Sequence, residues 1–301
     1  MKRSPAGVFA RGLAMGAADI VPGVSGGTIA LITGIYEQLL EAIVSADGDA
    51  LSMAVSGRWN ELWHRIDGGF LSILLLGILI AIFSMASGIH WLLTHYPQPL
   101  WSFFSGLILI SSVLLIRDEV TLDSIDCLAG FTFGVCIAVG AVLMPPVSFL
   151  VGLPGLFFAG AIAICAMILP GISGSFLLVL MGMYEQVLSA VKTLQVTELL
   201  VLAAGCVTGL LLFARLLQRC LQRYRALAMA FLSGVLMGSL VAVWPWRQEV
   251  LLNTAAGAIS ASRPVLPSTV TDAQLSACFG ACLIGCFFVW VTQAFASRRG
   301  L

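Results

Sequence analysis

Charged residues are scarce in this sequence of 301 residues. Only 30 side chains are charged, 15 basic and 15 acidic, which is 10% of the chain, whereas soluble domains carry about a quarter. So few charges cannot keep a surface of this size in water, which excludes a cytosolic enzyme and a nucleic-acid-binding protein. With 59% hydrophobic residues and a mean hydropathy of +1.03, the sequence indicates an integral membrane protein.

Groupings of residues that could bind a metal are also scarce. The chain has eight cysteines and three histidines, and most of the cysteines lie inside apolar segments. Cys278, Cys282 and Cys286 recur every four residues, but no further ligand lies close by to complete a soft-metal site. We interpret the cysteines as small packing residues, and expect no disulfide scaffold, no metal and no organic cofactor.

Long apolar runs are what the sequence has in abundance. Six segments are long enough to span about 30 Å of hydrocarbon: residues 69–93, 99–116, 127–144, 197–215, 226–244 and 276–296. Two further apolar stretches, 6–44 and 151–190, are interrupted by PGVSGGT at 22–28 and PGISGS at 170–175. Because proline and glycine break helices, we expect two re-entrant helical hairpins there, with kinked full spans as the alternative.

The basic residues are unevenly distributed over this arrangement. If the N-terminus is cytoplasmic, only Lys192, Arg247 and Arg263 of the fifteen basic residues lie in extracytoplasmic segments, and twelve lie in cytoplasmic ones. This is the positive-inside bias of membrane proteins, whose cytoplasmic loops are rich in lysine and arginine. The sequence therefore predicts a multi-pass protein with both termini in the cytoplasm.

The interrupted stretches form an internal repeat. Residues 22–40 align without gaps to 170–188, with nine identities in nineteen positions. Each half, 1–150 and 151–301, then contains one broken hairpin and three spans, and the odd number of spans makes the second half enter from the opposite side. We predict an all-α integral membrane protein with two inverted-topology repeats in a single membrane domain, as in secondary transporters.

The breaks predict an anion site. A helix follows each break, and its N-terminus with free N–H groups suits a phosphate. Two such ends facing each other would form an anion site, although small residues also permit close helix packing, and this alternative stays open. The candidate substrate-binding residues are Ser25, Gly26, Gly27, Thr28, Ser173, Gly174 and Ser175, and the residues that shape the breaks are Pro22, Gly23, Pro170 and Gly171.

Three acidic residues are candidates for coupling or gating. Asp19 lies three residues before Pro22, where its counterpart is Met167, so it could bind a proton or cation, or cap the broken helix. Glu37 and Glu185 each follow the loop serine by twelve residues, about 18 Å along a continuous helix. With the tyrosine and glutamine beside them, they could be interface anchors, gates or headgroup contacts.

Both breaks carry a family resemblance. The segments MGAADIVPGVSGGTIALITGIYE (15–37) and AICAMILPGISGSFLLVLMGMYE (163–185) resemble the polyprenyl-phosphate transporter family. The resemblance implies a bacterial inner-membrane carrier that returns undecaprenyl phosphate, the C55 lipid carrier, from the outer to the inner leaflet for peptidoglycan and other envelope polymers. The partners would be this lipid and the surrounding membrane lipids, with coupling to protons or sodium. The oligomeric state stays open.

Other functions fit the same architecture less well. Membrane undecaprenyl-pyrophosphate phosphatases also use inverted repeats and a Pro-Gly-x-Ser motif, but an arginine follows the serine, where it can stabilise the transferring phosphoryl group. Here Gly26 and Gly174 follow the serines, although Glu37 and Glu41 resemble the acidic motif of the phosphatase. We therefore expect no catalytic residues. An ion-coupled small-anion transporter is a third alternative, and a scaffold protein would not need two matching hairpins.

Overall fold

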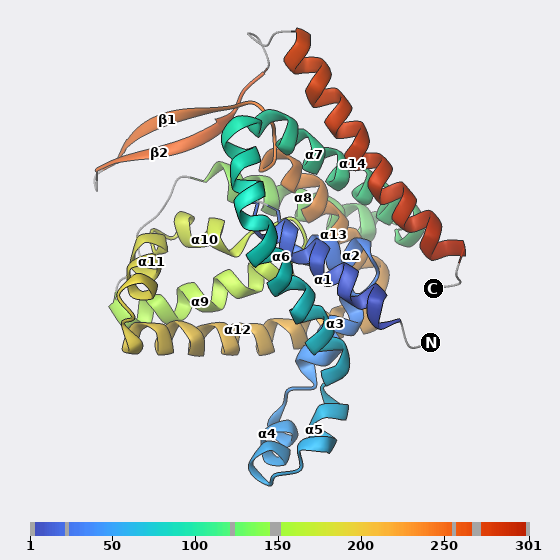
Figure 1. Cartoon of the computed structure of the whole chain (residues 1–301), viewed down its shortest axis with the longest axis vertical. Coiled ribbons are helices and arrows are strands. Elements are labelled where there is room, and N and C mark those ends of the chain that lie inside the picture. Colours follow the sequence, from blue (N-terminus) through green and yellow to red (C-terminus); the bar gives the residue numbers. More distant parts are fainter. Residues whose placement is uncertain are drawn as a thin grey trace.

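The computed structural model describes residues 4–21, 24–120, 124–144, 152–254, 257–266 and 272–298. The described part is helical apart from one β-hairpin (Figure 1). The first half contains α1 (Pro5–Asp19), α2 (Gly26–Ile32), α3 (Tyr36–Val44), α4 (Gly48–Val55), α5 (Trp59–Arg65), α6 (Gly68–His95), α7 (Pro97–Glu119) and α8 (Ile125–Leu143). The second contains α9 (Gly152–Ile168), α10 (Gly174–Leu180), α11 (Tyr184–Lys192), α12 (Val196–Arg223), α13 (Arg225–Gly238), the 3-10 helix η1 (Ser239–Val241), β1 (Arg247–Thr254), β2 (Gly257–Pro264) and α14 (Asp272–Arg298).

Three pairs of corresponding helices match in length, and corresponding pairs pack alike, although α7 has 23 residues and α13 only 14. Helices α2 and α10 have 7 residues each, α3 and α11 have 9, and α6 and α12 have 28. Helix α1 packs along α6 as α9 packs along α12, whereas α7 packs on α14 and α8 on α13, so that each half packs against the other. These last contacts are close. A Cβ on Gly106 of α7 would lie 2.1 Å from the carbonyl oxygen of Cys282 on α14.

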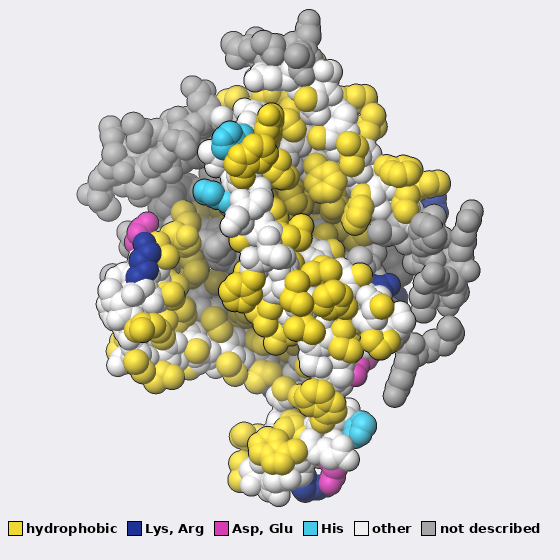
Figure 2. Space-filling model, viewed as in Figure 1, with side chains coloured by type: hydrophobic (Ala, Val, Ile, Leu, Met, Phe, Trp, Pro, Cys, Tyr) yellow, Lys and Arg dark blue, Asp and Glu magenta, His cyan; other side chains and the backbone are white. Residues whose placement is uncertain are grey.

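Five predicted spans are confirmed as helices long and apolar enough to cross a membrane: 68–95, 97–117, 125–143, 196–223 and 274–291. The predicted span 226–244 is not one long helix, since α13 has only 14 residues and η1 extends it to Val241. The Ser239 hydroxyl donates to the Leu236 carbonyl at 2.7 Å, and Pro245 prevents the helix from continuing. The exposed apolar helices make the chain a multi-pass membrane protein (Figure 2).

Each interrupted stretch contains two breaks, where the sequence predicted one. After the Pro-Gly break, the chain bends again by 117° between α2 and α3 and by 114° between α10 and α11. Gly34 and Gly182 occupy these bends with φ of 71° and 68°, in the left-handed region that glycine adopts without strain. Either bent pair has the geometry of a broken span or of a re-entrant loop. Pro22 and Gly23 lie outside the described residues.

Two features project from the helical body (Figure 1). Helices α4 and α5 form an unpredicted protrusion before α6, held at its base by an ion pair of 2.6 Å between Arg65 and Asp47. Arg65 lowers the pKa of the Asp47 carboxyl by donating a hydrogen bond to it. On another side, β1 and β2 pair in antiparallel fashion from Arg247 opposite Pro264 to Thr254 opposite Gly257. This hairpin is an addition to the predicted all-α fold.

Candidate functional site

The first break is attached directly to the second. Helix α9 ends at Ile168, so its last carbonyl groups have no partner within the helix. The Ser25 hydroxyl donates to the carbonyl of Met167 at 3.1 Å, and the Tyr36 hydroxyl donates to that of Ile168 at 2.9 Å. Two side chains of the first half thus satisfy the end of a helix in the second.

One further hydrogen bond joins the breaks. The Gly171 amide donates to the Thr28 hydroxyl at 2.8 Å, and both residues are buried. Gly171 has φ of 87°, and Pro170 beside it is fully buried. Thr28, a predicted substrate-binding residue, is therefore engaged in holding the two breaks together.

The N-terminus of α2 is capped by the protein itself. The Gly26 amide donates to Asp19 Oδ1 at 2.6 Å, and the Gly27 amide donates to Ser25 Oγ at 3.1 Å. These are two of the amides that the sequence assigned to an anion. Asp19 has the capping role that was one of its two interpretations, and its carboxylate occupies the position a phosphate would take.

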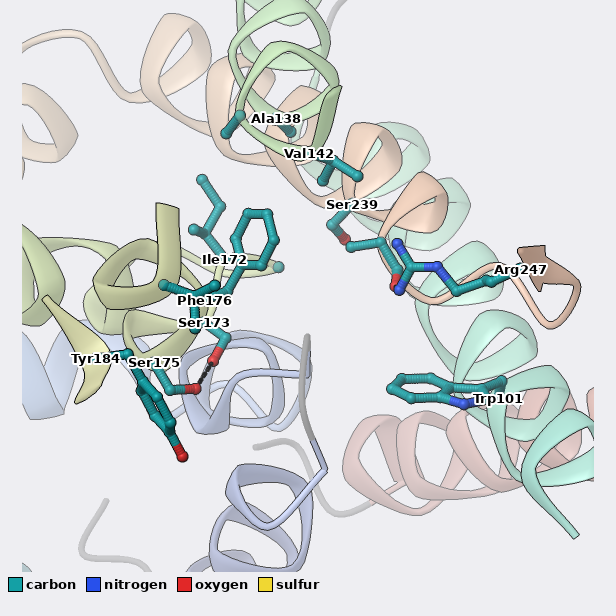
Figure 3. A pocket seen from close by; sticks show the side chains of 14 residues that line it. Trp101, Ala138, Val142, Ile172, Ser173, Ser175, Phe176, Tyr184, Ser239 and Arg247 are labelled. Carbon is teal, nitrogen blue, oxygen red and sulfur yellow. Dashed lines mark hydrogen bonds between the residues drawn. The ribbon is translucent and has the colours of Figure 1, made fainter. Parts of the chain in front are cut away.

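The second break has a different arrangement. Ser173 is the N-cap residue of α10 but makes no side-chain capping bond. Its hydroxyl lies 2.9 Å from that of Ser175, and Ser175 is exposed (Figure 3). Met167 stands where the first break has Asp19, so it offers no carboxylate to α10.

A cavity of about 410 Å³ lies beside the second break, and we call it the arginine cavity. Both halves line it, with Trp101 from α7 and Ser173, Ser175, Tyr184 and Arg247 from the second half. In Figure 3, Arg247 faces the two serines across the cavity. The lining is otherwise mostly apolar, which suits a ligand with one charged group.

Arg247 is the cationic residue of this cavity. Its Nη1 donates to the carbonyl of Ala242 at 2.7 Å, while its buried Nε has no partner among the described residues. Burial lowers the pKa of the Arg247 guanidinium, but arginine remains charged in proteins. From the sequence, Arg247 indicated only the membrane topology. A basic residue directly after an apolar segment, in an otherwise weakly basic region, is the signal that could have pointed to it.

A second cavity, of about 310 Å³, brings the two breaks together, and we call it the central cavity. Asp19 and Ser25 line it from the first break, and Ser173, Gly174 and Ser175 from the second. Five of the predicted residues thus share one space. Ser173 and Ser175 also line the arginine cavity, so the two cavities are adjacent.

A third and smaller cavity of about 120 Å³ continues beyond Asp19, and we call it the Tyr36 cavity. Gly26, Gly27 and Tyr36 line it, and Asp19 and Met167 line both it and the central cavity. Asp19 therefore stands between these two cavities.

The glycines of the breaks are also required for packing. A Cβ on Gly27 would lie 2.8 Å from the carbonyl oxygen of Met167, and one on Gly174 would lie 2.7 Å from that of Ala163. Neither backbone oxygen can move easily. Close packing, the alternative to an anion site, is thus one role of these glycines.

Glu37 and Glu185 lie away from these cavities. The predicted 18 Å of continuous helix does not exist, because α2 ends at Ile32 and α3 turns away. Glu37 Oε1 instead pairs with Arg225 Nη1 of α13 at 2.8 Å, and both side chains are half-exposed. Glu185 is exposed on α11. Tyr36, which precedes Glu37, is buried inside the protein.

Comparison with known proteins decides the family. The model of a family described as undecaprenyl phosphate translocase-like matches residues 15–261. The chain belongs to this family. Two relatives of this undecaprenyl phosphate translocase-like protein are each named polyprenyl-phosphate transporter. The one from Vibrio cholerae serotype O1 is 45% identical over 80% of this chain and 78% of the relative. The one from Staphylococcus aureus is 32% identical over 78% of this chain and 84% of the relative. No solved structure matches the chain.

Proposed function

We propose that the protein carries undecaprenyl phosphate from the outer to the inner leaflet of the bacterial inner membrane, for reuse in peptidoglycan and envelope synthesis. The family description and the names of both relatives support a polyprenyl phosphate as substrate. The arginine cavity is the observation that carries the proposal. It combines one guanidinium and several hydroxyl groups, among them those of Ser173 and Ser175, with a mostly apolar lining, as a lipid monophosphate requires.

The sequence of cavities supports a route for the headgroup. Ser173 and Ser175 belong to both the arginine and central cavities, and Asp19 to both the central and Tyr36 cavities. The charge bias of the sequence puts Arg247 outside and Arg225 inside. The phosphate would therefore bind first at Arg247, pass between the two breaks and leave past Tyr36, while the lipid tail stays in the membrane.

The two halves, 1–150 and 151–301, would act as inverted repeats around this route, with both termini in the cytoplasm. The equal lengths of three corresponding helix pairs and the similar bends of 117° and 114° support this. In this arrangement, each bent pair is a re-entrant hairpin. The substrate then lies where the broken segments of the two repeats meet, as in other secondary transporters.

Asp19 would couple transport to an ion. A phosphate entering the central cavity comes close to the Asp19 carboxylate, and two negative charges at short range in a poorly hydrated space repel each other. A proton on Asp19, or a bound sodium ion, removes this repulsion. Lipid phosphate and ion would then move together, and no organic cofactor takes part.

Reconstitution tests the transport function directly. The purified full chain is placed in liposomes with labelled undecaprenyl phosphate, and leaflet exchange and release of inorganic phosphate are followed together. Exchange without release is the expected result. Release would instead establish a phosphatase, and uptake of inorganic phosphate without lipid exchange would establish a small-anion transporter. Absence of exchange at any ion gradient contradicts the proposal.

A further inference from the structure

A larger cavity is lined by no residue of the two breaks. It has a volume of about 570 Å³ and lies between α7, α14 and the segment 244–246, so we call it the α7–α14 cavity. The route proposed for the phosphate does not use it. Its volume falls within the roughly 300–1,000 Å³ typical of ligand pockets.

The surface of the α7–α14 cavity is mostly apolar, although three serines also line it. Trp244 and Trp246 line it from the segment after α13, and Leu275 and Phe279 line it from α14. The Trp244 indole donates to the carbonyl of Val265 at 2.9 Å, and the two indoles pack edge to face with their centroids 5.5 Å apart. The tryptophans thus form a fixed wall, whereas Leu275 and Phe279 are exposed at the rim.

This cavity adjoins the arginine cavity through two pairs of consecutive residues. On α7, Trp101 lines the arginine cavity and Ser102 lines the α7–α14 cavity. After α13, Arg247 lines the first and Trp246 the second. The two cavities therefore lie close together on these two segments, although they share no lining residue.

A buried hydroxyl marks the junction. Ser102 is buried, and its Oγ has no hydrogen-bond partner among the described residues. The Oγ itself has almost no accessible surface, so a ligand in the cavity could reach it only after the side chain turned towards the cavity. Because buried polar groups almost always have a partner, such a turn would give this hydroxyl the acceptor that it lacks.

We propose that the α7–α14 cavity binds the first isoprenoid units of the lipid whose phosphate lies at Arg247, a proposal that rests on the proposed function. After turning towards the cavity, the Ser102 hydroxyl would donate to the oxygen that links phosphate and tail. The apolar chain would lie against Trp246 and Phe279. A site for the tail beside a site for the phosphate makes the protein select polyprenyl phosphates over inorganic phosphate and over other anionic lipids.

A matched pair of substitutions on α14 tests this. Leu275 and Leu283 are two helical turns apart and similarly exposed, at 47% and 53%, but only Leu275 lines the cavity. Leu275→Trp should fill the cavity and weaken binding of undecaprenyl and farnesyl phosphate about tenfold, leaving that of inorganic phosphate unchanged. Leu283→Trp should change none of the three affinities, measured by titration calorimetry on the full chain in detergent.

A second pair of substitutions on α14 keeps the proposal testable if a variant of the first pair does not fold. Phe279 lines the cavity and Phe287 does not, and both are exposed on α14. Phe279→Ala should weaken lipid phosphate binding several-fold, while Phe287→Ala should leave it unchanged. If both variants of each pair bind lipid phosphate equally well, the tail site is overturned. It is also overturned if the variants lose as much affinity for inorganic phosphate as for lipid phosphate. Either result leaves the proposed function standing. If the wild-type protein binds neither lipid phosphate, the proposed function fails, and the tail site fails with it.

Discussion

The two breaks have closely similar sequences but different surroundings. At the first, Ser25 accepts from the Gly27 amide and donates to Met167, and Asp19 accepts from the Gly26 amide. At the second, the hydroxyls of Ser173 and Ser175 contact each other and line two cavities. The same motif is therefore closed by protein contacts in one half and open to a ligand in the other.

A few substitutions between the copies explain this difference. The positions of Asp19 and Thr28 are occupied in the second copy by Met167 and Phe176, which cannot accept a hydrogen bond from a backbone amide as the first pair does. The first break thus gains a carboxylate that caps α2 and a hydroxyl that accepts from Gly171 of the second break. We infer that the first break positions the second, and that the second binds the phosphate.

The largest effect is expected at Arg247. Arg247→Gln removes the cationic group of the arginine cavity and should weaken binding of undecaprenyl phosphate by about tenfold to a hundredfold, since hydrogen bonds to charged groups are strong. Arg247→Lys keeps the charge but lacks the planar guanidinium group, so its affinity should lie between those of the wild-type protein and Arg247→Gln. Lys192→Gln, an exposed basic residue on α11, is the matched control. Unchanged affinity in Arg247→Gln would place the phosphate elsewhere.

A smaller effect is expected at Asp19. If ionised Asp19 repels the phosphate, wild-type transport falls as the pH rises through the pKa of this carboxyl. Asp19→Asn keeps an oxygen for the Gly26 amide but cannot ionise, so transport should lose this pH dependence, a difference of about tenfold at the alkaline end. Asp126→Asn on α8 serves as the control. An unchanged pH profile and rate in Asp19→Asn would leave Asp19 with its capping role alone.

The equivalent tyrosines should differ in their effect on stability. Tyr36 is 3% exposed and donates to the Ile168 carbonyl, whereas Tyr184 is 38% exposed at the arginine cavity. Tyr36→Phe leaves a carbonyl without its partner and should lower the free energy of unfolding by about 1–2 kcal/mol. Tyr184→Phe should lower it by less than about 0.5 kcal/mol. Denaturant unfolding in detergent measures the free energy of unfolding of both variants. Equal decreases would contradict the inference that the two breaks differ in their protein contacts.

Hydropathy and proline predicted much of this structure, because both act locally. Five long apolar runs are helices, and both Pro-Gly sites break the chain near Asp19 and Ile168. The bends at Gly34 and Gly182 were not predicted, since a lone glycine in an apolar run does not reveal its φ. Arg247 was missed because its position in a cavity depends on how the chain folds back after α13. No local pattern encodes that return.

The smallest effect is expected from substituting Glu37, which pairs with Arg225. Glu185 occupies the matching position of the second copy and serves for comparison. Both members of the pair are half-exposed, so Glu37→Gln should lower the free energy of unfolding by only about 0.5 kcal/mol, and less at high salt. Glu185→Gln should leave it unchanged. Transport should be nearly normal in both variants. A several-fold loss of transport in Glu37→Gln at unchanged stability would instead mean that the contact between α3 and α13 opens and closes during transport, and that Glu37 acts as a gate at the cytoplasmic end.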